Sequence, residues 1–149
     1  MHALELARED IERWCSNLTD AEINDRPAGL APVAFHILHI GNSMDRLLTY
    51  AEGRELSADQ FAAAKAELRS GASTKELLSG LTEAIDRSAR RVRAFAGAPS
   101  ELEEPRVVGR KRLPTTVGGL LVHVADHTQR HVGQAVITAK VVMAGRRES

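Results

Sequence analysis

The sequence contains few of the residues that hold small secreted domains or β-sandwiches together. Among its 149 residues there is a single cysteine, Cys15, which excludes a disulfide within the chain and favours a reducing setting. Aromatic residues make up only 3% of the chain, and alanine and leucine supply most of the apolar side chains. This composition favours helices over a β-sandwich, so we predict an all-α protein.

Net charge and long apolar runs are also absent. Lys and Arg number 20 and Asp and Glu number 20, so the formal net charge is zero and no bulk attraction to nucleic acid or membranes is expected. No uncharged apolar run approaches the roughly 18 residues that a membrane span needs. Segment 1–14 mixes acids and bases without an apolar core, so we expect no signal peptide and a soluble, cytoplasmic protein.

One group of basic residues could neutralise phosphates, as in a nucleic-acid-binding surface. Its members are Arg90, Arg91, Arg93, Arg106, Arg110, Lys111 and Arg112. Zero net charge, few aromatic residues for stacking on bases and the lack of a known binding motif argue against that function. We interpret the group as a solvated helix face and loop, and predict no nucleic-acid partner.

Apolar residues spaced three and four apart predict four long helices, and a capping box formed by Ser57 and Gln60 predicts one short helix. The long helices are expected at about 2–17, 32–53, 74–97 and 117–143, and the short one at about 57–68. Segment 100–114 has two prolines and no helical period, so it is expected to be a loop with a brief extended piece at Val107 and Val108. The pattern indicates a four-helix bundle in one domain of residues 1–149, and connections of roughly 14 to 20 residues require a long crossover.

The predicted last helix carries histidines on its apolar face. It reads VGGLLVHVADHTQRHVGQAVITAKVVM, and His123, His127 and His131 recur in it at four-residue steps. That spacing stacks the three side chains on one side of a helix. Because imidazoles four residues apart can point ring nitrogens at one ion, the pattern predicts that this helix contributes two ligands to a divalent metal site.

A third ligand must come from elsewhere in the chain. The outer two histidines of the last helix are separated by about 12 Å of rise, whereas two nitrogens on one zinc ion lie roughly 3 Å apart. His127 and His131 are the favoured pair because they lie deepest in the apolar stripe, and His123 is closer to the start of the helix. His36 and His39, three residues apart on the predicted second helix, are the candidates for the third ligand.

Several polar residues lie near the candidate ligands in the predicted helices. Asn42 and Asp126 could orient ring N–H groups, as hydrogen-bond partners of metal-bound histidines do. Gln134 lies three residues after His131 on nearly the same helix face. A carboxylate from Asp45 or Asp126 together with two histidines would instead suit iron, but three histidines already suffice for a site.

Two segments resemble the DinB/YfiT-like superfamily of metal-dependent enzymes. HVADHTQRHVGQ is similar to its His-x3-His-x3-His-x-Gly-Gln signature, and PVAFHILHIGNSMDRLL resembles its second helix, which has a Trp/Phe-His-Leu-x-His pattern. The resemblance implies a four-helix bundle with a long crossover and a three-histidine site for nickel, zinc or a similar divalent ion. Carried onto this chain, the ligands would be His39, His127 and His131. His36 and His123 match histidines of the motif that generally do not bind the metal.

The same resemblance implies an enzyme. Characterised members include thiol-dependent transferases and isomerases that use bacillithiol or mycothiol, and the amino-terminal part of ergothioneine-forming enzymes. We therefore expect an S-transferase that joins a low-molecular-weight thiol to a small electrophile, and by resemblance a homodimer. A metal-dependent hydrolase and a non-catalytic metal-binding or structural bundle are the alternatives. Val132 stands where many members have arginine, which leaves the substrate open.

Overall fold

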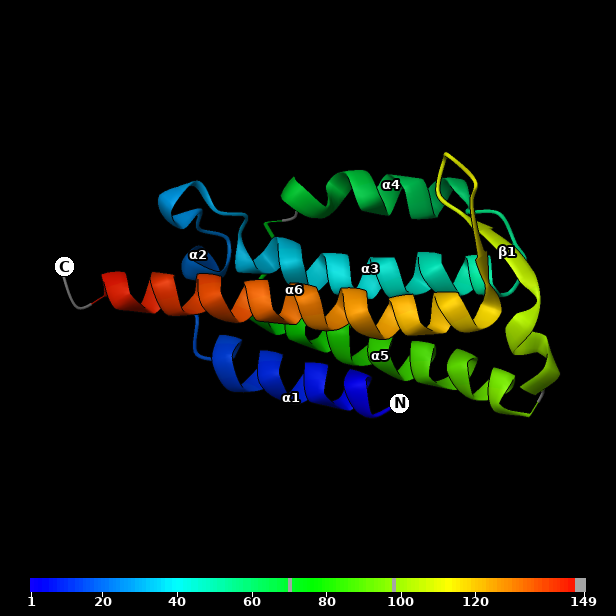
Figure 1. Cartoon of the computed structure of the whole chain (residues 1–149). Helices are drawn as coiled ribbons and strands as arrows, with labels where there is room; N and C mark the ends of the chain where they lie inside the picture. The colour runs from blue at the N-terminus through cyan, green and yellow to red at the C-terminus, as the bar shows by residue number, and fades with distance from the viewer. Residues whose placement is uncertain (70, 98, 147–149) are drawn as a thin grey trace.

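Four long helices run side by side in the computed structural model, which describes residues 1–69, 71–97 and 99–146 (Figure 1). They are α1 (His2–Cys15), α3 (Val33–Ala51), α5 (Thr74–Ala96) and α6 (Val117–Gly145). The predicted all-α four-helix bundle is confirmed. From the sequence we expect the C-terminal segment 145–149 to be frayed, and its residues 147–149 lie outside the described part of the chain. None of the helices described is both long and apolar enough to span a membrane.

Apolar side chains at helical spacing form the core between these helices. On α1, for example, Leu4, Ala7 and Ile11 are buried at steps of three and four residues. The most extensive contact joins α3 to α6, and α3 also packs along α5. At that second contact a Cβ added to Gly41 would lie 3.2 Å from the Cβ of Ala84, so glycine allows the two helices to approach closely.

The connection between α3 and α5 is the predicted long crossover. Both helices run in the same direction, so the chain returns over α3 before α5 begins (Figure 1). The returning segment contains α4 (Ala58–Ala66) and a 3-10 turn, η2 (Glu67–Arg69). The capping box expected at Ser57 and Gln60 is present at the start of α4. In the connection before α3, the chain forms α2 (Asp20–Ile23) and a 3-10 turn, η1 (Pro27–Gly29).

The segment before α6 is more ordered than the loop expected at 100–114. It forms a 3-10 turn, η3 (Pro99–Glu103), and two antiparallel strands, β1 (Pro105–Val108) and β2 (Leu113–Thr116). The extended piece at Val107 was correctly predicted, but its partner strand was missed. Pro114 pairs with Val107 in the ladder, and a two-stranded hairpin tolerates proline because each strand has a free edge. The turn places Gly109 and Arg112 at positive φ, which a non-glycine residue rarely adopts.

Candidate metal centre

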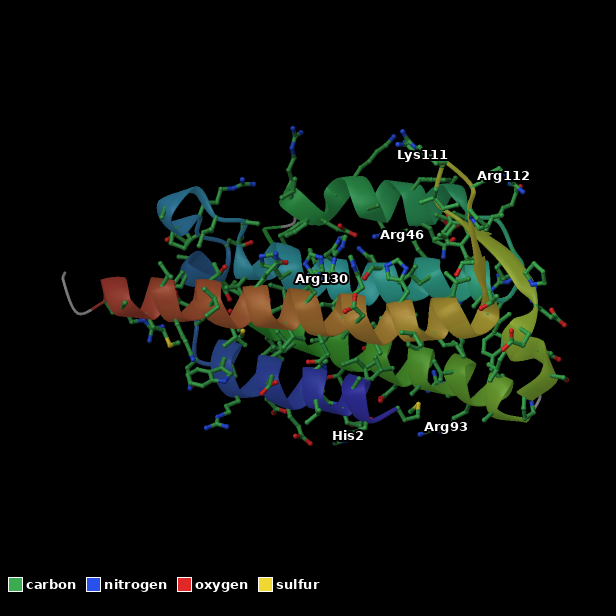
Figure 2. All side chains as sticks on the ribbon, in the orientation of Figure 1. His2, Arg46, Arg93, Lys111, Arg112 and Arg130 are labelled. Carbon is green, nitrogen blue, oxygen red and sulfur yellow. The ribbon has the colours of Figure 1, made fainter. Side chains whose placement is uncertain are left out.

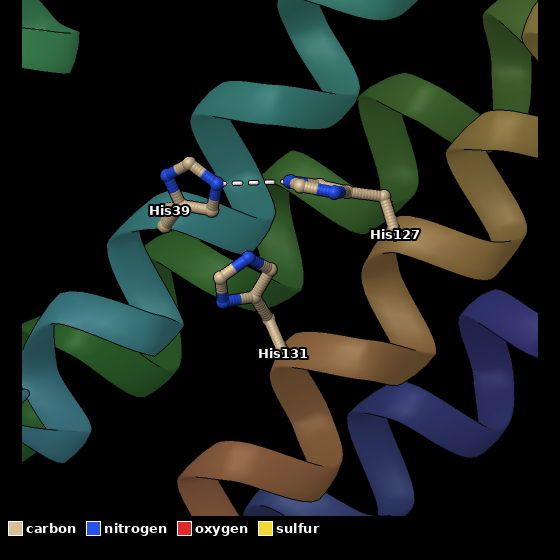
Figure 3. A group of neighbouring side chains, drawn as sticks. All are labelled: His39, His127 and His131. Carbon is tan, nitrogen blue, oxygen red and sulfur yellow. Dashed lines mark hydrogen bonds between the residues drawn. The ribbon is translucent and has the colours of Figure 1, made fainter.

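Three histidines meet where α3 packs against α6. His39 comes from α3, and His127 and His131 lie one turn apart on α6 (Figure 3). One ring nitrogen of each residue lies within 4.8 Å of the corresponding nitrogen of the other two. The His39 and His127 Nε2 atoms are 2.9 Å apart, and the His131 ring centroid is 4.3 Å from that of His39 and 4.6 Å from that of His127.

These distances suit a small cation. Zinc–nitrogen bonds are about 2.0–2.1 Å long, so two imidazole nitrogens on one tetrahedral ion lie about 3.3 Å apart. The three ring nitrogens, all within 4.8 Å of one another, therefore lie near the spacing that a shared ion requires. Each residue is partly buried, and each sits on a helix of the bundle rather than on a loop. The cluster is compatible with a divalent metal site.

The protonation state of the cluster also suits metal binding. Burial, followed by the neighbouring His131 and His39 rings, lowers the pKa of His127 to about 4. Burial and the nearby His39 ring also lower the pKa of His131. Both imidazoles are therefore neutral at pH 7, and a neutral imidazole keeps a lone pair that can bind a metal ion.

Glu67 fixes the tautomer of His39. Its Oε2 lies 2.7 Å from the Nδ1 of His39, and Glu67 as a residue is only 5% exposed. Burial opposes ionisation of this carboxyl group, but hydrogen bonds from His39, Arg46 and Asn42 outweigh it and hold its pKa below the usual value. An ionised carboxylate only accepts, so the Nδ1–H of His39 donates to it. The Nε2 lone pair of His39 then faces the other two rings.

His36 lies behind His131 rather than among the three converging rings. The Nδ1 atoms of the two residues are 3.1 Å apart, which leaves the Nε2 of His131 to face His39 and His127. His36 is only 5% exposed, and burial together with the His131 and His39 rings lowers its pKa to about 4. A neutral His36 can accept the Nδ1–H of His131. Phe35 packs beside this group, with its ring stacked on that of His39 at 5.3 Å.

The remaining polar candidates lie further from the converging nitrogens. His123 is exposed, and its ring centroid is 5.7 Å from that of His127. Asn42 donates to Glu67 instead of to a histidine ring. Asp126 was expected to orient a ring N–H, but it pairs with Arg130 on the surface of α6. Gln134 is exposed, and within the described part of the chain it has no hydrogen bond to the cluster.

Glu67 was not anticipated from the sequence. A glutamate near the end of a helix looks like a solvent-exposed residue, and nothing local indicates its contact with His39, which lies 28 residues away in the sequence. One weak signal existed, because an acidic residue in the last turn of a helix faces the negative end of the helix dipole and needs a compensating partner. The partners of Glu67 are residues of α3, and the path of the crossover is what brings Glu67 to them.

The basic residues discussed above do not form one free surface. Arg91 bridges Asp45 and Glu52 at 2.6 Å each, and Arg106 pairs with Glu104 at 2.9 Å. Other basic residues of the group lie apart from one another: Arg93 is on α5, and Lys111 and Arg112 are at the hairpin turn (Figure 2).

The family of the chain follows from its match to a family model described as the DinB superfamily, which covers residues 3–135. The chain belongs to the DinB superfamily. Its fold is also similar to a crystal structure described as the conserved protein of locus from Enterococcus faecalis, with a TM-score of 0.68 and 21% sequence identity over 96% of this chain and 94% of that one. At that identity the likeness shows the fold alone. No curated protein matches this DinB-superfamily chain.

Proposed function

We propose that this DinB-superfamily protein is a divalent-metal-dependent enzyme in which His39, His127 and His131 would hold the ion. The observation that carries the proposal is the convergence of three imidazole nitrogens within 4.8 Å, from two helices of the bundle. Nickel and zinc suit such a set because imidazole is a good ligand for both. A structural zinc site usually has four protein ligands, whereas a catalytic site usually has three and leaves one position for water or substrate. Three ligands here therefore favour a catalytic site.

The chain itself would prepare the three rings. The Nδ1–H of His39 donates to Glu67, and the Nδ1–H of His131 can donate to His36. Both rings would therefore present Nε2 toward the same point. Phe35 stacks on one face of the His39 ring. The rings of His36, His39 and His131 lie on packed helices, so binding an ion would need little rearrangement of the backbone that carries them.

We propose transfer of a low-molecular-weight thiol to a small electrophile as the reaction, which the family supports. A bound divalent ion lowers the pKa of a thiol or water, so that the anion is available near neutral pH. A hydrolase would use the same site with water in place of the thiol. A non-catalytic bundle would hold metal without turnover.

We also propose that residues 1–149 form one domain and that the protein is a homodimer. Sedimentation would test the oligomeric state.

The first test is whether the untagged protein binds one ion at these residues. We expect about one zinc or nickel ion per chain by elemental mass spectrometry in the wild type, and loss of that ion in His127→Ala. Gln134→Ala is the matched control, because Gln134 lies on the same helix but is exposed. Full metal content in His127→Ala would contradict the ligand assignment.

The second test is turnover. Zinc- or nickel-loaded protein is mixed with cysteine and 1-chloro-2,4-dinitrobenzene, and formation of the aryl thioether with release of chloride is followed. We expect a rate above background that His131→Ala abolishes and Gln134→Ala preserves. Equal rates for wild type and His131→Ala would rule out the catalytic proposal. Hydrolysis of an activated ester by the same loaded protein, without thiol transfer, would favour the hydrolase.

A further inference from the structure

The crossover lies on α3 with little apolar contact. No residue of α4 is buried, and the largest apolar side chain of this helix, Phe61, is 43% exposed. Polar contacts attach the segment instead. Gln60 donates to Asp45 at 2.5 Å and to Thr49 at 2.9 Å, and Glu67 is the buried residue of the following turn. An element held in this way separates from its neighbours at a low free-energy cost.

Glu67 joins the crossover to one face of α3. Its Oε2 accepts from the Nδ1 of His39 at 2.7 Å, and its Oε1 accepts from Asn42 and Arg46 at 3.1 Å each. The three donors follow one another at steps of three and four residues, so they lie on the same side of the helix. One of these donors is the ring whose other nitrogen faces His127 at 2.9 Å. The crossover therefore contacts the candidate metal centre directly, through the ring of His39.

We infer that Glu67 is a positioning residue that couples occupation of the metal centre to docking of the crossover, residues 57–69, on α3. The inference rests on the proposed function, since it requires His39 to be a ligand. A carboxylate behind a metal-bound histidine fixes the ring and raises the basicity of the bound nitrogen. A cation on Nε2 in turn makes the Nδ1–H a stronger donor to the carboxylate, because it withdraws electron density from the ring.

The coupling acts equally in both directions. If the docked carboxylate raises the affinity of the site for a metal ion, the metal ion must favour docking by the same factor. Loss of a partner behind a metal-bound histidine typically costs about 10- to 100-fold in metal affinity. We expect the same range for Glu67, and a comparable increase in the protection of the crossover when zinc binds.

Zinc affinity of three proteins tests the first direction. Glu67→Gln keeps the size of the side chain and removes its charge, and we expect the zinc dissociation constant to rise about 10- to 100-fold. Glu22→Gln is the matched control, because it makes the same substitution at a glutamate that pairs with Arg146 and not with His39. Its zinc affinity is expected to stay close to that of the wild type. A purely structural role for Glu67 predicts no change in zinc affinity for either variant.

Hydrogen exchange tests the second direction, and its main comparison, the wild type with and without zinc, needs no variant. We expect zinc to slow amide exchange in residues 57–69 of the wild type and of Glu22→Gln, but not of Glu67→Gln. If zinc binds the wild type and leaves that exchange unchanged, or if Glu67→Gln binds zinc as tightly as the wild type, the inference is wrong and the proposed metal site stands. If the wild type binds neither zinc nor nickel, or His39→Ala binds the ion equally well, the proposed function fails and the inference fails with it.

Discussion

We expect acid to destabilise the metal-free protein, because His36 is buried and is harder to protonate in the folded chain than in the unfolded one. The pKa of His36 is about 4 in the folded chain, against 6.5 for an unperturbed histidine, because burial and then the nearby His131 and His39 rings disfavour its charged form. The unfolded chain therefore binds a proton at a higher pH than the folded chain. The stability associated with neutral His36 is complete above pH 6.5 and is lost as the pH falls toward 4.

The size of the effect follows from these two values. At pH 5 nearly all unfolded chains but few folded ones carry the proton, which lowers the free energy of unfolding by about 2 kcal/mol relative to pH 7.5. Urea denaturation of the chelator-treated protein at both pH values measures the loss. Other groups contribute as well, so the difference between the wild type and His36→Leu isolates this residue, since leucine fills a similar volume and does not titrate.

We expect His36→Leu to lose about 2 kcal/mol less than the wild type between pH 7.5 and pH 5. The control is Gln134→Ala, which should lose as much as the wild type because Gln134 is exposed. Equal losses for wild type and His36→Leu would refute the reasoning, because they would mean that His36 is as easily protonated in the folded chain as in the unfolded one.

Two further predictions concern the rest of the bundle. Gly41→Val should destabilise the protein by about 1–3 kcal/mol in urea denaturation, because even a Cβ at that position would lie 3.2 Å from Ala84; an unchanged midpoint would show that the contact of α3 with α5 is loose. Burial raises the pKa of Cys15 to about 12, so iodoacetamide at pH 8 should modify this thiol only when the chain unfolds; rapid modification of the native protein would contradict its burial.

Local patterns were sufficient to predict the four long helices, because each buries a stripe whose spacing can be read in the sequence. Leu4, Ala7 and Ile11 on α1 are an example. The hairpin before α6 was harder to predict, since its strands contain Pro105 and Pro114 and its turn uses a left-handed arginine, Arg112, where glycine or asparagine would have been a signal.

The three converging histidines were also predicted, because four-residue spacing on α6 and a histidine pair on α3 are visible without coordinates. Which histidine of the α3 pair faces the other rings depends on the orientation of α3 about its own axis. The resemblance to the family predicted His39 rather than His36. Whether these rings are the ligands stays a prediction. Glu67 could not be predicted, because its contact with His39 is created by the path of a crossover whose residues carry no apolar pattern.

X-ray absorption at the zinc edge is the measurement that tests the central claim most directly. For the zinc-loaded, untagged wild type we predict three imidazole nitrogens at about 2.0–2.1 Å from the ion, and a loss of one of them in each of His39→Ala, His127→Ala and His131→Ala. A first shell without imidazole nitrogens, or one that all three substitutions leave unchanged, would contradict the account.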